Sequence, residues 1–123
     1  MNGTNAQAAD SDTRWNKVCG RDDLVAHSGV VALLDGAQIA LFYLPGEQGD
    51  GQVFALENRD PRSGANVIGR GLIGNLAGKL VVAAPLYKQH FGLEDGVCVE
   101  APTERLKVWR ARLREGDVEV RVG

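Results

Sequence analysis

The sequence predicts an all-β fold, an antiparallel sandwich or small barrel, and three observations support this prediction. Apolar runs are short and are separated by turn residues, with 16 glycines in 123 residues. The segment "LKVWRARLREGDVEVRV" near the C-terminus alternates apolar and polar residues, which is the period of a half-buried strand. Helix signals are few. Short strands at close spacing are typical of sandwiches and small barrels.

The N-terminal half contains four expected strands and one expected helical turn. Residues 14–19 alternate weakly, and "RDDLVAHSG" at 21–29 has the acidic start and glycine end of a single helical turn. The apolar runs at 30–34 and 38–44 flank Asp35-Gly36, a pair that favours a tight hairpin turn. Residues 45–51 are a polar loop, and 52–58 form the next strand.

The C-terminal half contains one buried strand and the strongest hairpin. We expect a turn near Ala77-Gly78 and a strand at 80–83. The final hairpin should turn at residues 115–117. Its apolar phase slips between Val108 and Trp109, which indicates either a bulge or a change of packing partner.

Composition favours one ordinary domain. We expect a disordered tail at 1–12 and a single domain at 13–123. The net charge of −2 argues against a nucleic-acid partner. No run is long enough for a membrane span, and no secretory signal is present, so we expect a cytoplasmic protein. Cys19 and Cys98 should be reduced, with a disulfide as the minor alternative.

The sequence contains no recognisable catalytic or metal motif. "GRGLIG" at 69–74 fits the dinucleotide pattern, but a turn and a strand follow it where a helix is needed, so we interpret it as a glycine-rich turn region. No C-x-x-C, H-x-x-H or G-x-S-x-G is present. The Arg-rich segment at 105–114 is interpreted as a solvated strand face. We therefore assign no catalytic, cofactor-binding or metal-binding residue.

Two proline loops, "NRDPRSG" at 58–64 and "VVAAPLYKQHF" at 81–91, carry the most specific signal. Their order between strands resembles that of Rieske iron–sulfur domains, which bind a cluster through Cys and His in two such loops. In this sequence the Cys positions are Asp60 and Ala84, and the His positions are Arg62 and Tyr87. The resemblance therefore implies a Rieske-like fold whose cluster-binding subdomain lacks its ligands. The 21 residues between Arg62 and Ala84 also exceed the usual Rieske gap.

The combination of "WNKVCGRDDL", "ALENRDPRSGANVIGRGLIG" and "LVVAAPLYKQHFGLEDGVC" is similar to the small subunit of assimilatory NAD(P)H-dependent nitrite reductase, over about residues 13–122. That resemblance implies a subunit without a redox centre. Its partner would be a large subunit that carries FAD, an iron–sulfur cluster and sirohaem and reduces nitrite to ammonium. The residues expected to bind this partner are Arg59, Arg62, Tyr87, Lys88 and His90.

Three other interpretations remain open at this point. In the first, the prolines only preserve turns, and Arg62 and Asp60 pair as a local replacement for the cluster. The chain could be a stand-alone Rieske-like interaction or regulatory module without an enzyme partner. A genuine Rieske electron carrier is the least favoured, because all four ligands are missing.

Overall fold

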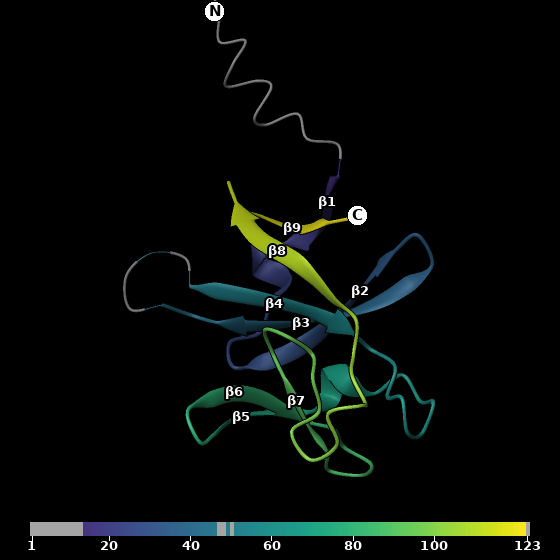
Figure 1. Ribbon diagram of the computed structural model, residues 1–123. Helices are drawn as coiled ribbons and strands as arrows, with labels where there is room; N and C mark the ends of the chain where they lie inside the picture. Colours follow the sequence, from purple (N-terminus) through teal and green to yellow (C-terminus); the bar gives the residue numbers. More distant parts are fainter. Residues whose placement is uncertain (1–13, 47–48, 50, 123) are drawn as a thin grey trace, which may run out of the picture.

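The computed structural model describes residues 14–46, 49 and 51–122, and within them the chain forms two antiparallel sheets (Figure 1). The six-stranded sheet has the order β1-β9-β8-β4-β3-β2, and the three-stranded sheet has the order β5-β6-β7. The strands are β1 (Trp15–Gly20), β2 (Ser28–Leu34), β3 (Ala37–Leu44), β4 (Gln52–Glu57), β5 (Leu72–Leu76), β6 (Lys79–Ala83), β7 (His90–Gly92), β8 (Val108–Arg114) and β9 (Asp117–Arg121). Two 3₁₀ turns, η1 (Arg21–Asp23) and η2 (Ile68–Arg70), are the only helical elements described. The predicted all-β fold is confirmed.

The tight turns explain why the predicted hairpins form. Asp35 and Gly36 join β2 to β3 with φ of 51° and 82°, the positive values that a two-residue hairpin turn requires. Glu115 and Gly116 join β8 to β9 with φ of 52° and 83°. The second turn is one residue shorter than expected, because Asp117 already belongs to β9.

The structure decides two predictions about local structure, the phase slip in β8 and the helical turn near residues 21–29. The phase slip at Val108 and Trp109 is a change of partner, because these two residues pair with Leu56 and Ala55 of β4, whereas pairing with β9 begins at Arg110. A bulge does occur, but in β1, between Lys17 and Cys19. The expected helical turn near residues 21–29 is η1.

Strand β3 separates two hydrophobic cores. Ala40 and Phe42 face one core and Ile39 and Leu41 face the other, as the alternation of side chains along a strand requires. The first core lies between the two sheets and includes Leu56, Ile68, Val82, Ala84, Phe91, Leu93, Cys98 and Leu106. The second is enclosed by the six-stranded sheet and includes Ala32, Ala55, Val118 and Val120. The first core supports the small sheet and both proline loops.

The glycine-rich segment at 69–74 lies in η2 and β5, and a strand follows it, as expected for a turn region. Its role is close packing. A methyl group added at Gly29 of β2 would collide with the carbonyl oxygen of Gly69, so η2 rests directly on the backbone of β2.

The predicted tail at 1–12 and part of the loop at 45–51 lie outside the described residues. Both cysteines are free, as expected, and Cys98 is buried. Within the described part of the chain, no helix is long and apolar enough to cross a membrane.

Candidate partner-binding site at the two proline loops

The first proline loop is organised around the side chain of Asp60. Its Oδ1 accepts hydrogen bonds from the backbone N–H groups of Arg62 (2.8 Å) and Ser63 (3.4 Å), which is a local Asx turn. The Asp60 carbonyl accepts the N–H of Gly64, whose φ of 77° lets the chain reverse. Asp60 is completely buried. The loop is therefore fixed from inside by the residue that stands at the first Rieske cysteine position.

Asn58 anchors the base of the same loop. Its Oδ1 accepts the N–H of Gly69 at 2.7 Å, and its Nδ2 donates to Gln38 Oε1 at 2.9 Å. These bonds connect the loop to η2 and to β3, and Asn58 is itself buried. A buried amide with its groups paired is a rigid support.

The second proline loop closes by backbone contacts. The N–H of Lys88 donates to the carbonyl of Ala84 at 3.0 Å, and the N–H of Ala84 donates to the carbonyl of Gln89 at 2.9 Å. Lys88 has a φ of 62°, which turns the chain back toward β7. Ala84 is completely buried, whereas Leu86 and Tyr87 at the loop's apex are exposed.

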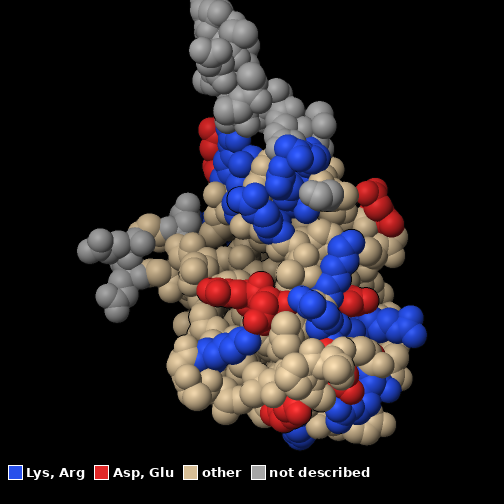
Figure 2. Space-filling model, in the orientation of Figure 1, with Lys and Arg blue, Asp and Glu red and all other residues tan. Residues whose placement is uncertain are grey.

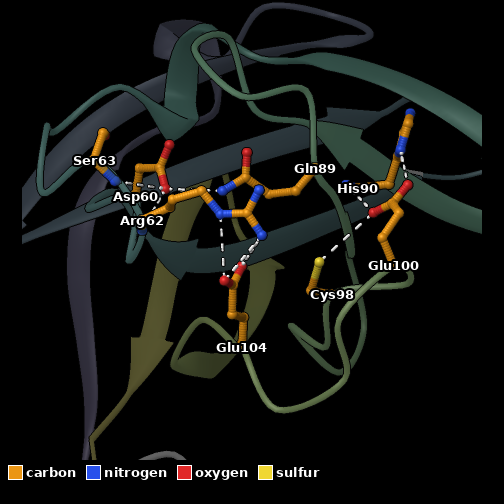
Figure 3. Close-up of polar contacts among 8 residues, drawn as sticks. All are labelled: Asp60, Arg62, Ser63, Gln89, His90, Cys98, Glu100 and Glu104. Carbon is orange, nitrogen blue, oxygen red and sulfur yellow. Dashed lines mark hydrogen bonds and ion pairs between the residues drawn. The ribbon is translucent and has the colours of Figure 1, made fainter.

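The two loops are joined by a buried hydrogen bond. Gln89 Nε2 donates to Asp60 Oδ1 at 3.0 Å, across a sequence separation of 29 residues (Figure 3). The other oxygens, Asp60 Oδ2 and Gln89 Oε1, are buried without a hydrogen-bond partner among the described residues, and in Figure 3 both point to the same side. The carboxylate therefore connects loops that a cluster connects in a Rieske domain.

An exposed ion pair also fixes the first loop to the segment before β8. The Arg62 guanidinium donates to Glu104 through Nε (3.3 Å to Oε2) and Nη2 (3.1 Å to Oε1), in a two-point contact seen in Figure 3. This hydrogen bond raises the pKa of Arg62. The guanidinium also lies 5.9 Å from the ring centre of Tyr87, within the range of a cation–π contact. The two residues at the Rieske histidine positions thus contact each other.

The alternative in which Arg62 pairs with Asp60 holds for the Arg62 backbone and not for its side chain. Asp60 does accept the backbone N–H of Arg62, but the guanidinium pairs with Glu104. This residue lies beside the loop although it is 42 positions further along the chain. The physical reason is that Asp60 is buried and already bonded to the loop backbone, while the long Arg62 side chain extends toward solvent.

The residues at the four ligand positions do not fit a [2Fe–2S] cluster. Ala84 has no donor atom, Arg62 is a permanent cation, and Tyr87 is directed to solvent. Asp60 supplies only hard oxygens, one of which is occupied by three N–H donors. No group of three or more His, Cys, Asp and Glu residues that could hold a metal occurs in the described ranges.

The predicted partner-binding residues are only partly brought together. Arg62 and Tyr87 are in contact, and Lys88 is exposed next to them. Arg59 instead lines a hollow of about 320 Å³ with Asn66, Lys107 and Trp109. His90 belongs to β7 and is turned toward Glu100.

The His90–Glu100 contact is a structural one. Glu100 accepts the backbone N–H of His90 at 2.9 Å and contacts the ring Nδ1 at 2.5 Å. The backbone hydrogen bond, with a smaller contribution from the ring, lowers the pKa of Glu100 to about 2. This pair holds the start of β7 against the loop that follows it, so His90 is engaged within the chain.

Sequence reasoning named Tyr87 but missed the two exposed leucines of this surface, Leu72 and Leu86. Leu86 and Tyr87 are 55% and 56% exposed, and Leu72 at the start of β5 is 77% exposed. Leu72 pairs with Ala83, directly before the second loop, so these side chains belong to one end of the molecule. Large exposed apolar residues that cluster beside cations are characteristic of a protein-binding surface. We call Arg62, Leu72, Leu86, Tyr87 and Lys88 the tip.

The Arg-rich strand differs from the tip. Figure 2 shows Lys and Arg gathered at the top of the view, over β8 and β9. Arg112 pairs with Glu119 at 2.6 Å and lies over the ring of Trp15 at 4.0 Å. The charge of Arg112 is therefore compensated within the sheet. Arg110 is exposed but Arg112 and Arg114 are half-buried, so the interpretation of this strand as a solvated face holds only in part.

Comparison with known proteins places this geometry in a family. The sequence model of the family described as "Rieske-like [2Fe-2S] domain" matches residues 14–121. The nitrite reductase (NADH) small subunit of Salmonella typhimurium is 41% identical over 109 residues, covering 89% of this chain and 98% of that protein. The solved structure of the E. coli protein NirD has a TM-score of 0.77 and 41% identity, covering 89% of this chain and 96% of that one.

A further relative has a different organisation. The nitrite reductase [NAD(P)H] large subunit of Klebsiella oxytoca is 39% identical over 106 residues, which are 86% of this chain but 11% of that protein. The same domain is therefore found as a separate small protein and as one segment of a large-subunit chain. On its fold, its altered cluster loops and these relatives, the chain belongs to the Rieske-like family of nitrite reductase (NADH) small subunits.

Proposed function

We propose that this chain is the non-redox small subunit of a cytoplasmic NAD(P)H nitrite reductase, which reduces nitrite to ammonium. The large subunit carries FAD, an iron–sulfur cluster and sirohaem, and the small subunit docks on it and supports its activity. The observation that carries the proposal is the matching segment inside a large-subunit chain, because a covalent fusion keeps two domains in contact at high effective concentration.

The tip is the docking surface in this proposal. Its centre is apolar, with Leu86 and Tyr87, and cations lie at its margin. The buried Asp60–Gln89 bond joins the two loops before binding, and the Arg62–Glu104 pair fixes the first of them. A surface that is ordered in advance loses less entropy when a partner binds.

Contact, and not electron transfer, is the means by which the small subunit acts. None of the four ligand positions offers a thiolate or an imidazole, so the chain has no donor set for a Rieske cluster at the tip. Its effect on nitrite reduction must then come from stabilising or orienting the large subunit.

Co-purification and activity of the two subunits test the proposal. The small subunit alone should not reduce nitrite, and its addition should raise NAD(P)H-dependent nitrite reduction by the large subunit. Tyr87→Ala and Leu86→Ala should each weaken the complex by about 1–2 kcal/mol. Leu33→Ala is the matched control, since Leu33 is 68% exposed on β2 and is not part of the tip.

The alternative of a stand-alone interaction module makes the opposite prediction. In that case the two subunits would not co-purify, and nitrite reduction by the large subunit would be independent of this chain. If the complex forms but the tip variants bind normally, the docking surface lies elsewhere.

A further inference from the structure

Strand β5 is an unprotected edge. It is the outer strand of the β5-β6-β7 sheet, and its sequence Leu-Ile-Gly-Asn-Leu contains no charge and no proline. Its described pairing with β6 is continuous and contains no bulge. Natural proteins usually protect exposed edges with charges, prolines or bulges, because an open edge accepts another strand. An edge that lacks these devices is suited to binding an extended segment.

The turn between β5 and β6 determines which backbone groups are open. Ala77 and Gly78 have φ of 53° and 86°, so this is a two-residue turn of the I′ kind, flanked by the pair Leu76 and Lys79. The flanking pair of such a turn is hydrogen-bonded, and the bonded pairs then alternate along the ladder. Ile73 and Asn75 are therefore the residues whose N–H and C=O groups face away from β6.

The side chains leave this edge accessible. Leu72 is 77% exposed and Leu76 is 38% exposed, and both lie on the same side of the strand as Gly74. A methyl group added at Gly74 would meet nothing within 4 Å. The edge thus presents two leucines separated by a flat glycine, with room for side chains of an added strand.

The other uncharged edge is less open. Strand β2 also lies at the end of its sheet and exposes Val31 and Leu33. However, η2 covers its first residues, because Gly69 packs against the backbone of Gly29 and against Val31. In β5, by contrast, four of the five residues are exposed, and its Leu72 is part of the tip.

We propose that an extended, uncharged segment of the large subunit adds to β5 as a further strand of the small sheet. The inference rests on the proposed function and deepens it, because β5 continues directly from the docking surface. The backbone of Ile73 and Asn75 forms the hydrogen bonds, and Leu72 and Leu76 contact the side chains of the added strand. The tip determines where the large subunit binds, and pairing with β5 requires that its bound segment be extended.

Amide hydrogen exchange at single residues, measured on the full chain with and without the large subunit, tests this inference. Binding should slow exchange of the Ile73 and Asn75 amides by about tenfold or more, because these amides gain partners, and should change the Gly74 amide less. A tip-only contact would not protect amides 73 and 75. Leu72→Lys should weaken the complex by about tenfold or more. Leu33→Lys, the same change on the other exposed edge, should leave binding unchanged.

Each other outcome overturns the inference in a distinguishable way. If the complex forms and supports nitrite reduction without protecting amides 73 and 75, the strand addition is refuted and the proposed function stands. An equal loss from Leu33→Lys would mean that added charge acts without specificity. Protection that rises with the concentration of the small subunit alone would assign the edge to a second copy of this chain. If no complex forms at all, the proposed function fails and this inference fails with it.

Discussion

Replacing Asp60 with alanine should destabilise the protein strongly, because one buried carboxylate connects the two proline loops. The substitution removes acceptors for the Arg62 N–H at 2.8 Å and for Gln89 Nε2 at 3.0 Å. It also leaves the Gln89 amide buried without a partner for its N–H group. Hydrogen bonds to a charged group and an unpaired buried donor each contribute about 1–3 kcal/mol.

Together these losses predict that Asp60→Ala lowers the free energy of unfolding by about 3 kcal/mol, after allowing for the cost of burying the carboxylate. For a domain of this size, that corresponds to a fall in Tm of roughly 10–15 °C. Asp60→Asn is the matched control. Asparagine keeps an acceptor oxygen for the same donors. Its amide nitrogen takes the place of Oδ2, which has no hydrogen-bond partner among the described residues, so no existing bond is lost there. The loss of stability should therefore be about 1 kcal/mol or less.

Urea unfolding at neutral pH, followed by tryptophan fluorescence, measures both variants. The double variant Asp60→Ala with Gln89→Ala should lose less than the sum of the two single variants, because the residues share one hydrogen bond. The reasoning is refuted if Asp60→Ala loses less than about 1 kcal/mol, or if Asp60→Asn loses as much as Asp60→Ala.

Three further predictions concern the metal, pH and packing. Anaerobically prepared protein should contain no stoichiometric iron and should show no Rieske-type visible spectrum, and a cluster found in it would contradict the donor chemistry of the loops. Glu100 has its pKa lowered to about 2 from 4.5, so its contribution to stability is complete above about pH 4.5 and is lost as the pH falls toward 2. Urea midpoints measured across this range should therefore fall less steeply for Glu100→Gln than for the unaltered chain, and parallel curves would refute this. Gly29→Ala should cost about 2 kcal/mol or more, since the methyl group meets the Gly69 carbonyl, whereas Gly74→Ala, where space is open, should lower stability little. A thermal melt of each variant decides the point, and equal Tm values would contradict the close packing.

The strands that could be predicted are those whose turns are encoded locally. Asp35-Gly36 and Glu115-Gly116 supply positive φ angles between apolar runs, and both hairpins formed as expected. Strand β5 was not predicted, because its glycine and asparagine are poor strand formers and its pairing with β6 supplies the structure. Strand β7 has three residues, too few to show a period.

The sequence predicted the two proline loops of the candidate site but not the side-chain contacts that hold them. The prolines and the order of the strands located both loops. The pairs that hold the loops, Asp60 with Gln89 and Arg62 with Glu104, join residues 29 and 42 positions apart, and no local pattern links them. The exposure of Leu72 and Leu86 depends on the sheet order for the same reason. His90 was expected to contact the partner, but it belongs to β7 and pairs with Ala83 of β6.

The closure of the two loops by side chains has a consequence for how the protein is produced. In a protein whose loops are held by a metal group, the final structure waits for the metal to be supplied, and binding free energy becomes folding free energy. Here Asp60, Gln89, Arg62 and Glu104 are all delivered by translation itself. The contacts that hold these two loops therefore form without a supply of iron and without the cellular machinery that builds clusters.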